Sequence, residues 1–158
     1  MFSTLRTAFV AAALSVWAAG TLTQAAPPVP VSRINISIDD KGYYYTTKKF
    51  AAKAGSDVKV VLAVPPNSRL PGANLIILKP RSEARFLRIL RAMPHPRTNQ
   101  NNYVPASNDI LCKTGWVVRG ARTSLSLKVP TAPGTYTYLC TWPRGIGSSM
   151  RGTMIVVK

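Results

Sequence analysis

Residues 129–158 read VPTAPGTYTYLCTWPRGIGSSMRGTMIVVK, and this stretch decides the fold. Its Pro-Gly pair predicts a turn, and the strand that follows places Tyr138 and Cys140 on one face because side chains alternate along an extended chain. A loop that contains a proline and Met150 then leads into a final apolar strand at residues 153–158. The stretch therefore predicts two strands joined by a loop, with a thiol at its start and a thioether near its end.

Short strand patterns separated by turns fill most of the remaining chain. The one helix pattern covers residues 82–92, with Ser82 as capping residue and Glu83 in the first turn. The pair Asp39-Asp40 belongs to a turn sequence, so its carboxylates diverge and do not form an acid–base pair. Alternating or apolar runs predict strands at residues 33–38, 43–47, 50–53, 57–63, 74–78, 110–118, 124–129, 135–141 and 153–158. Many short strands with one helix indicate an antiparallel sandwich or barrel.

The first 25 residues have the pattern of a secretory signal peptide. Arg6 precedes an apolar run from Ala8 to Ala19, and small residues end the segment at Ala25. The run is shorter than the roughly 20 apolar residues that span a bilayer. We therefore expect a periplasmic or secreted protein with no transmembrane segment in the mature chain. The expected segments are a signal peptide at 1–25, an extended lead-in at 26–32 and one domain at 33–158.

The charge is strongly unbalanced. The chain has 21 Lys and Arg against 5 Asp and Glu, a formal net charge of +16. Such a field attracts anionic partners. For an exported protein these would be anionic lipid head groups, acidic envelope polymers or an acidic protein rather than nucleic acid. The alternative is that the charge only confers solubility.

The helix pattern has a basic side. Arg81, Arg85 and Arg88 line up there, opposite an apolar side that contains Phe86 and Leu90. A basic amphipathic helix can lie on an anionic membrane surface as a peripheral contact. The alternative is a helix that packs on a sheet and keeps its charges in water.

Several motifs resemble the azurin and plastocyanin family of cupredoxins. The run CTWPRGIGSSMRG, from Cys140 to Gly152, is similar to the copper loop C-T-F-P-G-H-x-x-x-M-x-G of that family. The run ANLIILKP, residues 73–80, is similar to the H-N and apolar strand of azurin-like proteins, and residues 50–55 and 103–107 also match in order. The resemblance spans most of the mature chain. It implies an all-β, cupredoxin-like antiparallel Greek-key β-sandwich with one short helix.

The resemblance also implies where copper ligands would lie. A type 1 copper site takes two histidines and a cysteine in one plane, with a weak axial methionine. Cys140 matches the thiolate and Met150 the axial ligand, but Ala73 stands at the first histidine position. Gly145 or Ile146 stands at the second. The whole chain contains one histidine, so we expect a degenerate copper site and no cofactor.

Other ligand sets remain open in the sequence. The single histidine, His95, lies in a proline-rich loop, either as an exposed loop residue or as a recruited ligand. With Met93, Cys140 and Met150 it would offer soft donors of the kind that Cu(I) accepts. Arg144 disfavours a second positive charge nearby. A disulfide between Cys112 and Cys140 also remains open in an oxidising compartment.

Three functions follow from these patterns. The first is an exported, non-redox binding or structural module with affinity for anionic partners. The alternatives are a copper-binding periplasmic electron carrier of the blue-copper family and a Cu(I)-handling protein that uses Cys140 and Met150. An enzyme is not expected, because no acid–base constellation is present.

Overall fold

The structure is a computed structural model that describes residues 32–41, 43–93, 103–142 and 150–158. The elements in chain order are β1 (Ser32–Ser37), β2 (Lys49–Lys53), β3 (Asp57–Ala63), β4 (Gly72–Ala73), β5 (Ile76–Leu78), α1 (Glu83–Ala92), β6 (Ile110–Lys113), β7 (Val117–Val118), β8 (Arg122–Lys128), β9 (Gly134–Leu139) and β10 (Arg151–Val157). The predicted signal peptide and lead-in lie outside the described residues, as do His95, Arg144, Gly145 and Ile146.

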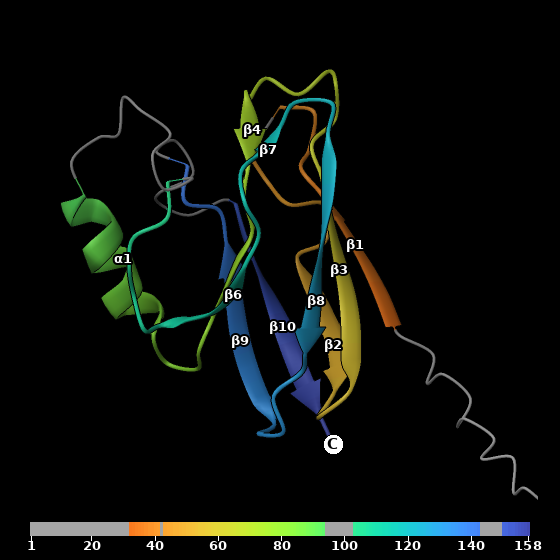
Figure 1. Ribbon diagram of the computed structural model, residues 1–158, viewed down its shortest axis with the longest axis vertical. Coiled ribbons are helices and arrows are strands. Elements are labelled where there is room, and N and C mark those ends of the chain that lie inside the picture. The colour runs from red at the N-terminus through yellow and green to blue at the C-terminus, as the bar shows by residue number, and fades with distance from the viewer. Residues whose placement is uncertain (1–31, 42, 94–102, 143–149) are drawn as a thin grey trace, which may run out of the picture.

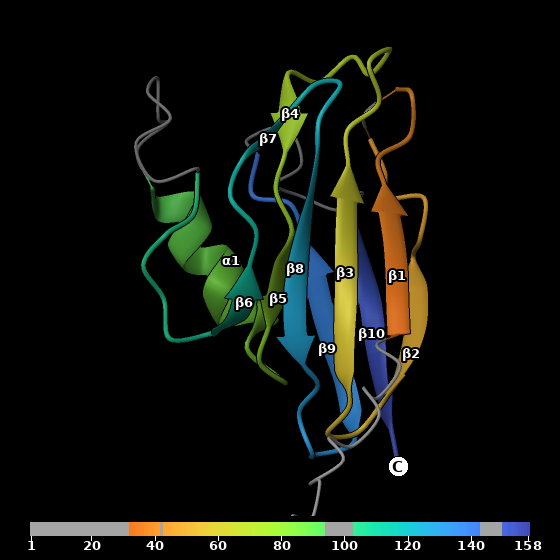
Figure 2. The ribbon, with the colours of Figure 1, turned by 45° about the vertical axis from the view of Figure 1, so that its right-hand side comes forward.

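Two sheets face each other and form a sandwich. A three-stranded sheet has the order β1-β3-β8, and a five-stranded sheet has the order β2-β10-β9-β5-β6. Figure 2 shows β1, β3 and β8 in front of β2, β9 and β10. A short pair, β4 and β7, lies at the end of the sandwich opposite the C-terminus (Figure 1). The predicted all-β sandwich with one short helix is confirmed.

Two strand pairs correct the expectation of an antiparallel sandwich. β1 pairs with β3 in parallel, with Ile34 opposite Val60. β10 pairs with β2 in parallel, with Met154 opposite Phe50. The remaining strand pairs within the described elements are antiparallel. Alternation alone could not reveal this, because a strand has the same side-chain period in either pairing.

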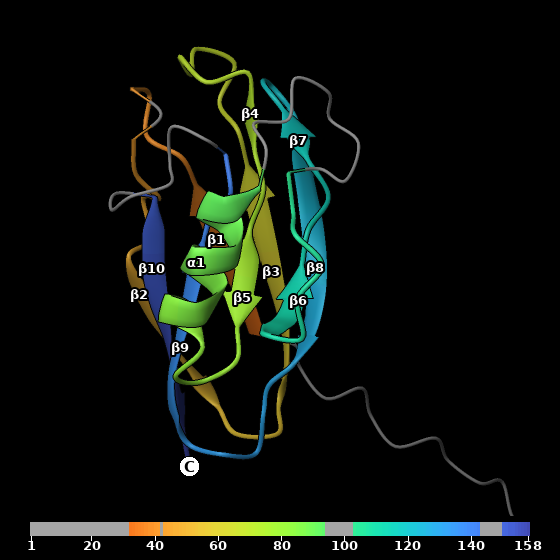
Figure 3. The same ribbon diagram turned by 90° about the vertical axis from the view of Figure 1, so that its left-hand side faces the viewer.

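The core lies between the sheets, and a second apolar layer lies under the helix. Inward residues such as Val60, Leu62 and Met154 are fully buried. On the outer face of β5 and β9, α1 packs Phe86 and Leu90 against Ile76, Leu78 and Leu139 (Figure 3). Because β5 is covered on both faces, its sequence is a continuous apolar run instead of an alternating one.

Two predicted strands differ from the structure. Residues 43–47 form no strand; Tyr45 makes a single bridge to Ile38. The predicted strand 110–118 is divided into β6 and β7 at Thr114. The backbone N–H of Thr114 donates to the Leu75 carbonyl (2.9 Å), and the Thr114 hydroxyl accepts from the Leu75 N–H (2.9 Å). The division lets the chain cross to β4.

Within the described residues, no helix is long and apolar enough to cross a bilayer.

Candidate metal centre

The two sulfur residues matched to the copper loop meet at one end of the sandwich. Cys140 directly follows β9, and Met150 directly precedes β10. These strands are antiparallel neighbours with Leu139 opposite Arg151, so the residues just beyond the pair must lie together. The amide of Cys140 donates to the carbonyl of Met150 (3.0 Å), and both side chains are buried.

A side-chain clamp holds the segment of Ala73 against this loop. The Asn74 amide nitrogen Nδ2 donates to Thr141 Oγ1 (2.7 Å), and the Thr141 backbone N–H donates to Asn74 Oδ1 (2.9 Å). The backbone N–H of Asn74 also bonds to Cys140. We refer to Ala73, Asn74, Cys140, Thr141 and Met150 as the thiol end of the molecule. Ala73 therefore lies beside the thiol, as its position in the motif requires, but offers only a methyl group.

The thiol of Cys140 is buried and hydrogen-bonded. Burial raises its pKa, while backbone N–H groups of Asn74, Trp142 and Thr141 and the Tyr45 side chain oppose that rise. The Trp142 amide lies 3.5 Å from Sγ, and the Tyr45 hydroxyl donates to the Asn74 carbonyl (2.5 Å). Burial also raises the pKa of Tyr45 well above its usual value. Burial therefore favours the protonated thiol of Cys140, and the hydrogen-bond donors around it favour the thiolate.

The donor set does not fit a type 1 copper centre. Such a centre takes two imidazoles, and the chain has one histidine. The described residues contain no group of three or more His, Cys, Asp or Glu that could hold a metal ion. The predicted roles of His95 and of Gly145 or Ile146 lie outside the described residues. Two sulfur atoms, Cys140 Sγ and the thioether of Met150, are the donors that the thiol end provides in the described part of the chain.

An aromatic cluster borders the thiol end. The ring centroids of Tyr103 and Trp116 are 4.8 Å apart, those of Tyr103 and Trp142 are 4.9 Å apart, and those of the two tryptophans are 5.2 Å apart. Gly72 makes room for it, since a Cβ there would lie 2.6 Å from Trp116 Cε2. Sequence reasoning missed this cluster. The one available indication was the tryptophan at position 142, where the family loop has phenylalanine.

The two cysteines do not form a disulfide. Both are free thiols, Cys112 half-buried and Cys140 buried. Cys112 lies opposite Ile77, and Ile77 lies opposite Tyr138, so β6 and β9 are separated by β5. Two strand spacings amount to about 9.5 Å, whereas a disulfide needs Cα atoms within about 7 Å. Burial raises the pKa of Cys112 to about 12.

The three arginines of the predicted basic side are exposed on α1 or directly before it. Arg81 precedes α1 in a left-handed conformation (φ 59°). Arg85 Nε donates to both carboxylate oxygens of Asp109 (2.8 and 3.0 Å), and these hydrogen bonds hold the pKa of that carboxyl below its usual range. Ser82 Oγ donates to the Lys79 carbonyl (2.7 Å) and does not cap the helix. Arg85 and Arg88 are therefore both exposed on α1, and of these two only Arg85 is paired with a carboxylate in the described residues.

Comparisons with known structures agree with this architecture. Neither the protein-family models nor the curated proteins gave a match to the sequence. Auracyanin A, a "blue" copper protein from the green thermophilic photosynthetic bacterium Chloroflexus aurantiacus, matches with a TM-score of 0.70 and 25% identity over 81% of this chain and 100% of that chain.

Two further solved structures match in the same way. Reduced auracyanin from the photosynthetic bacterium Roseiflexus castenholzii gives a TM-score of 0.66 and 25% identity over 80% of this chain and 98% of that one. An azurin from the obligate methylotroph Methylomonas sp. strain J gives a TM-score of 0.63 and 24% identity over 80% of this chain and 98% of that one. The chain therefore has the cupredoxin fold.

Proposed function

We propose that this chain is an exported cupredoxin-fold protein that works without a blue copper centre, as a binding or structural module for an anionic partner of the cell envelope. The observation that carries the first part is the methyl group of Ala73. It is fully buried beside Cys140, at the position where the family motif has a histidine. The scaffold around the thiol is kept while the imidazole is lost.

Charge supports the anionic partner. The chain has 5 Asp and Glu, and three of them form ion pairs, with Arg85, Lys128 and Arg151. All other lysines and arginines of the described residues lack an ion pair with a carboxylate. An excess of this size speeds encounter with anionic surfaces and is screened by salt. The signal-peptide pattern supports a periplasmic or secreted location.

Vesicle binding tests the proposal. The mature protein should sediment with vesicles that contain phosphatidylglycerol at low ionic strength and dissociate as salt rises, while neutral phosphatidylcholine vesicles leave it in solution. Absence of binding to anionic vesicles and to acidic envelope extracts at low salt would remove the anionic partner.

Copper addition tests the lost centre. Protein mixed with Cu(II) should stay colourless, because the trigonal imidazole ligands are missing. An intense blue colour would show an electron-transfer centre assembled from donors outside the described residues, and the proposal would fail. Absorption spectra and metal analysis of protein purified from its native compartment test for the same copper centre without added copper.

Cu(I) handling is a second candidate, favoured by one observation. The backbone hydrogen bond between Cys140 and Met150 brings a thiol and a thioether to one place, and Cu(I) accepts soft sulfur ligands. A Cu(I) titration should then show weaker affinity in Cys140→Ala than in the wild type. Equal affinity in the two proteins would rule this candidate out.

A further inference from the structure

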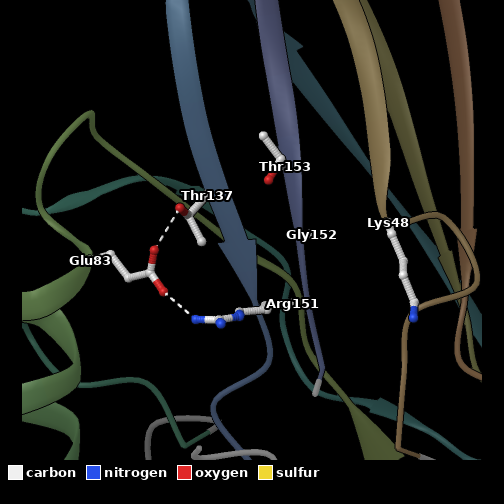
Figure 4. A pocket seen from close by; sticks show the side chains of 6 residues that line it. All are labelled: Lys48, Glu83, Thr137, Arg151, Gly152 and Thr153. Carbon is white, nitrogen blue, oxygen red and sulfur yellow. Dashed lines mark hydrogen bonds and ion pairs between the residues drawn. The ribbon is translucent and has the colours of Figure 1, made fainter. Parts of the chain in front are cut away.

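A pocket of about 410 Å³ lies on the outer face of the five-stranded sheet, next to the start of α1. It is lined by Lys48, Glu83, Thr137, Arg151, Gly152 and Thr153, which we call the outer pocket (Figure 4). Thr137 comes from β9, Gly152 and Thr153 come from β10, and Lys48 comes from the segment before β2. The volume falls in the range of small-molecule sites, roughly 300–1,000 Å³.

The only carboxylate among the residues that line the pocket, Glu83, is already engaged. Its Oε2 accepts from Thr137 Oγ1 (2.9 Å), and its Oε1 accepts from Arg151 Nη1 (2.9 Å). An arginine has five N–H donors, so Arg151 keeps others for a ligand while Glu83 fixes its direction. Glu83 therefore positions a cation at the pocket.

Lys48 supplies a second cation from the other side. Figure 4 shows its amine on the side of the strands away from Glu83. Its carbonyl accepts from the Thr153 N–H (2.8 Å), and the preceding carbonyl, of Thr47, accepts from the Tyr138 hydroxyl. The amine lies 4.6 Å from the centre of the Tyr44 ring. The lysine thus starts from a fixed backbone and has no ion pair within the described residues.

These lining groups suit an oxyanion. Two cations and one carboxylate line the pocket, which leaves it with excess positive charge. A planar carboxylate is held by the arginine fork alone, whereas a tetrahedral phosphate presents oxygens in several directions and can reach donors on opposite walls. We propose that the outer pocket binds a phosphate group, as a phosphomonoester or a phosphodiester, between Arg151 and Lys48. The inference rests on the proposed function, because it says where an anionic partner is held.

The pocket differs from the other basic parts of the surface. Arg81, Arg88 and Arg91 are exposed on or beside α1 and do not line the outer pocket. Arg85 is committed to Asp109. These arginines add to the field around the protein, whereas Arg151 and Lys48 line one pocket from opposite sides (Figure 4). Binding in the pocket should therefore depend on which charge is removed, and not only on how many.

A matched pair of variants uses this difference. Lys48→Gln removes an ammonium from the pocket, and Lys59→Gln removes one from β3 in the opposite sheet, where the side chain is also exposed. Inorganic phosphate is titrated into the mature wild type and both variants, followed by calorimetry and by the amide shifts of Gly152 and Thr153. Lys48→Gln should raise the Kd about tenfold, the loss of one charge-assisted hydrogen bond, and Lys59→Gln less than about twofold. Arg151→Gln should weaken binding as Lys48→Gln does, and melting curves check that each variant folds.

Two further ligands distinguish the possible sources of the phosphate. They also distinguish failure of the pocket from failure of the proposed binding to anionic surfaces. Glycerol phosphate and phosphatidylglycerol vesicles replace inorganic phosphate in turn. Undetectable phosphate binding by the wild type, or equal losses in Lys48→Gln and Lys59→Gln, would overturn the pocket. If vesicles still bind in that case, the anionic-surface function stands without it. If phosphate binds with the predicted selectivity and vesicles do not, the pocket stands and the surface function fails.

Discussion

The thiol end and the outer pocket meet in the sequence at Met150 and Arg151, but they differ in burial, charge and hydrogen bonding. At the thiol end, Cys140 and Met150 are buried, their backbones are bonded to each other, and Asn74 and Thr141 satisfy one another. In the outer pocket, Arg151 follows Met150 directly, yet its side chain is 53% exposed and belongs to a charged, open site. One fold thus holds an apolar, hydrogen-bonded interior and, one residue further along the chain, a charged surface site.

The largest expected effect concerns the two free thiols, and it appears at alkaline pH. Burial raises the pKa of Cys112 from 9.0 to about 12 and also raises the pKa of Cys140. A group whose pKa is raised on folding contributes stability that is complete below its unfolded pKa and is lost as pH rises toward the folded one. Because of Cys112, the free energy of unfolding should therefore fall between about pH 9 and 12, by about 1.4 kcal/mol per pH unit.

Urea denaturation across this pH range measures the effect. Cys112→Ala should show a shallower decline, since one of the titrating groups is gone. A free energy of unfolding that stays constant from pH 8 to 11 would contradict the burial of these thiols.

The clamp gives the next effect. Asn74→Ala removes two buried hydrogen bonds to Thr141 and leaves the partner groups unsatisfied, at a cost of about 2–4 kcal/mol. Asn67→Ala, in an exposed loop, should change the free energy of unfolding by less than about 0.5 kcal/mol. Chemical denaturation compares the two. Similar, small losses in both would mean that the thiol end does not depend on the clamp.

The smallest expected effect concerns the ion pair between Arg85 and Asp109. Arg85→Gln should raise the pKa of Asp109, because the hydrogen bonds of Arg85 are the main cause of its low value. The stability that a lowered carboxyl pKa contributes is present above the unfolded pKa and is lost as pH falls. In the variant this loss should therefore be smaller and should be complete at a higher pH.

Arg88→Gln is the matched control, since Arg88 is an exposed arginine one turn further along α1. It should leave the Asp109 titration, followed by NMR of the carboxyl carbon, unchanged. An equal shift in the two variants would mean that only the overall field acts on Asp109.

The sequence predicts best where local pattern and motif coincide. The strand, loop and strand from Gly134 to Val157 were predicted because alternation, a turn pair and an apolar run all agree there. β4 was missed, because two residues show no periodicity. Residues 43–47 were wrongly predicted as a strand: the Asp39 carboxylate accepts the backbone N–H groups of Tyr43 and Tyr44 (2.7 Å each), which a strand would use in its ladder.

The candidate sites show the same limit. Cys140 and Met150 could be found from the loop motif, since both belong to one continuous stretch. The clamp joins Asn74 and Thr141, which lie 67 residues apart in the sequence. Asn74 is a fully buried polar residue next to an apolar strand, and nothing in the sequence nearby identifies its partner. The outer pocket draws on the segment before β2, on α1, and on β9 and β10, so no single stretch displays it.

The position of β10 has a consequence for how the protein is made. Residues 151–157 lie between β2 and β9, so the five-stranded sheet remains in two parts until the ribosome has supplied Val157. Partners about a hundred positions apart must then find each other, and such long-range pairing slows folding because the entropy of closing the loop is lost first. Closure of the five-stranded sheet therefore has to wait for the last strand.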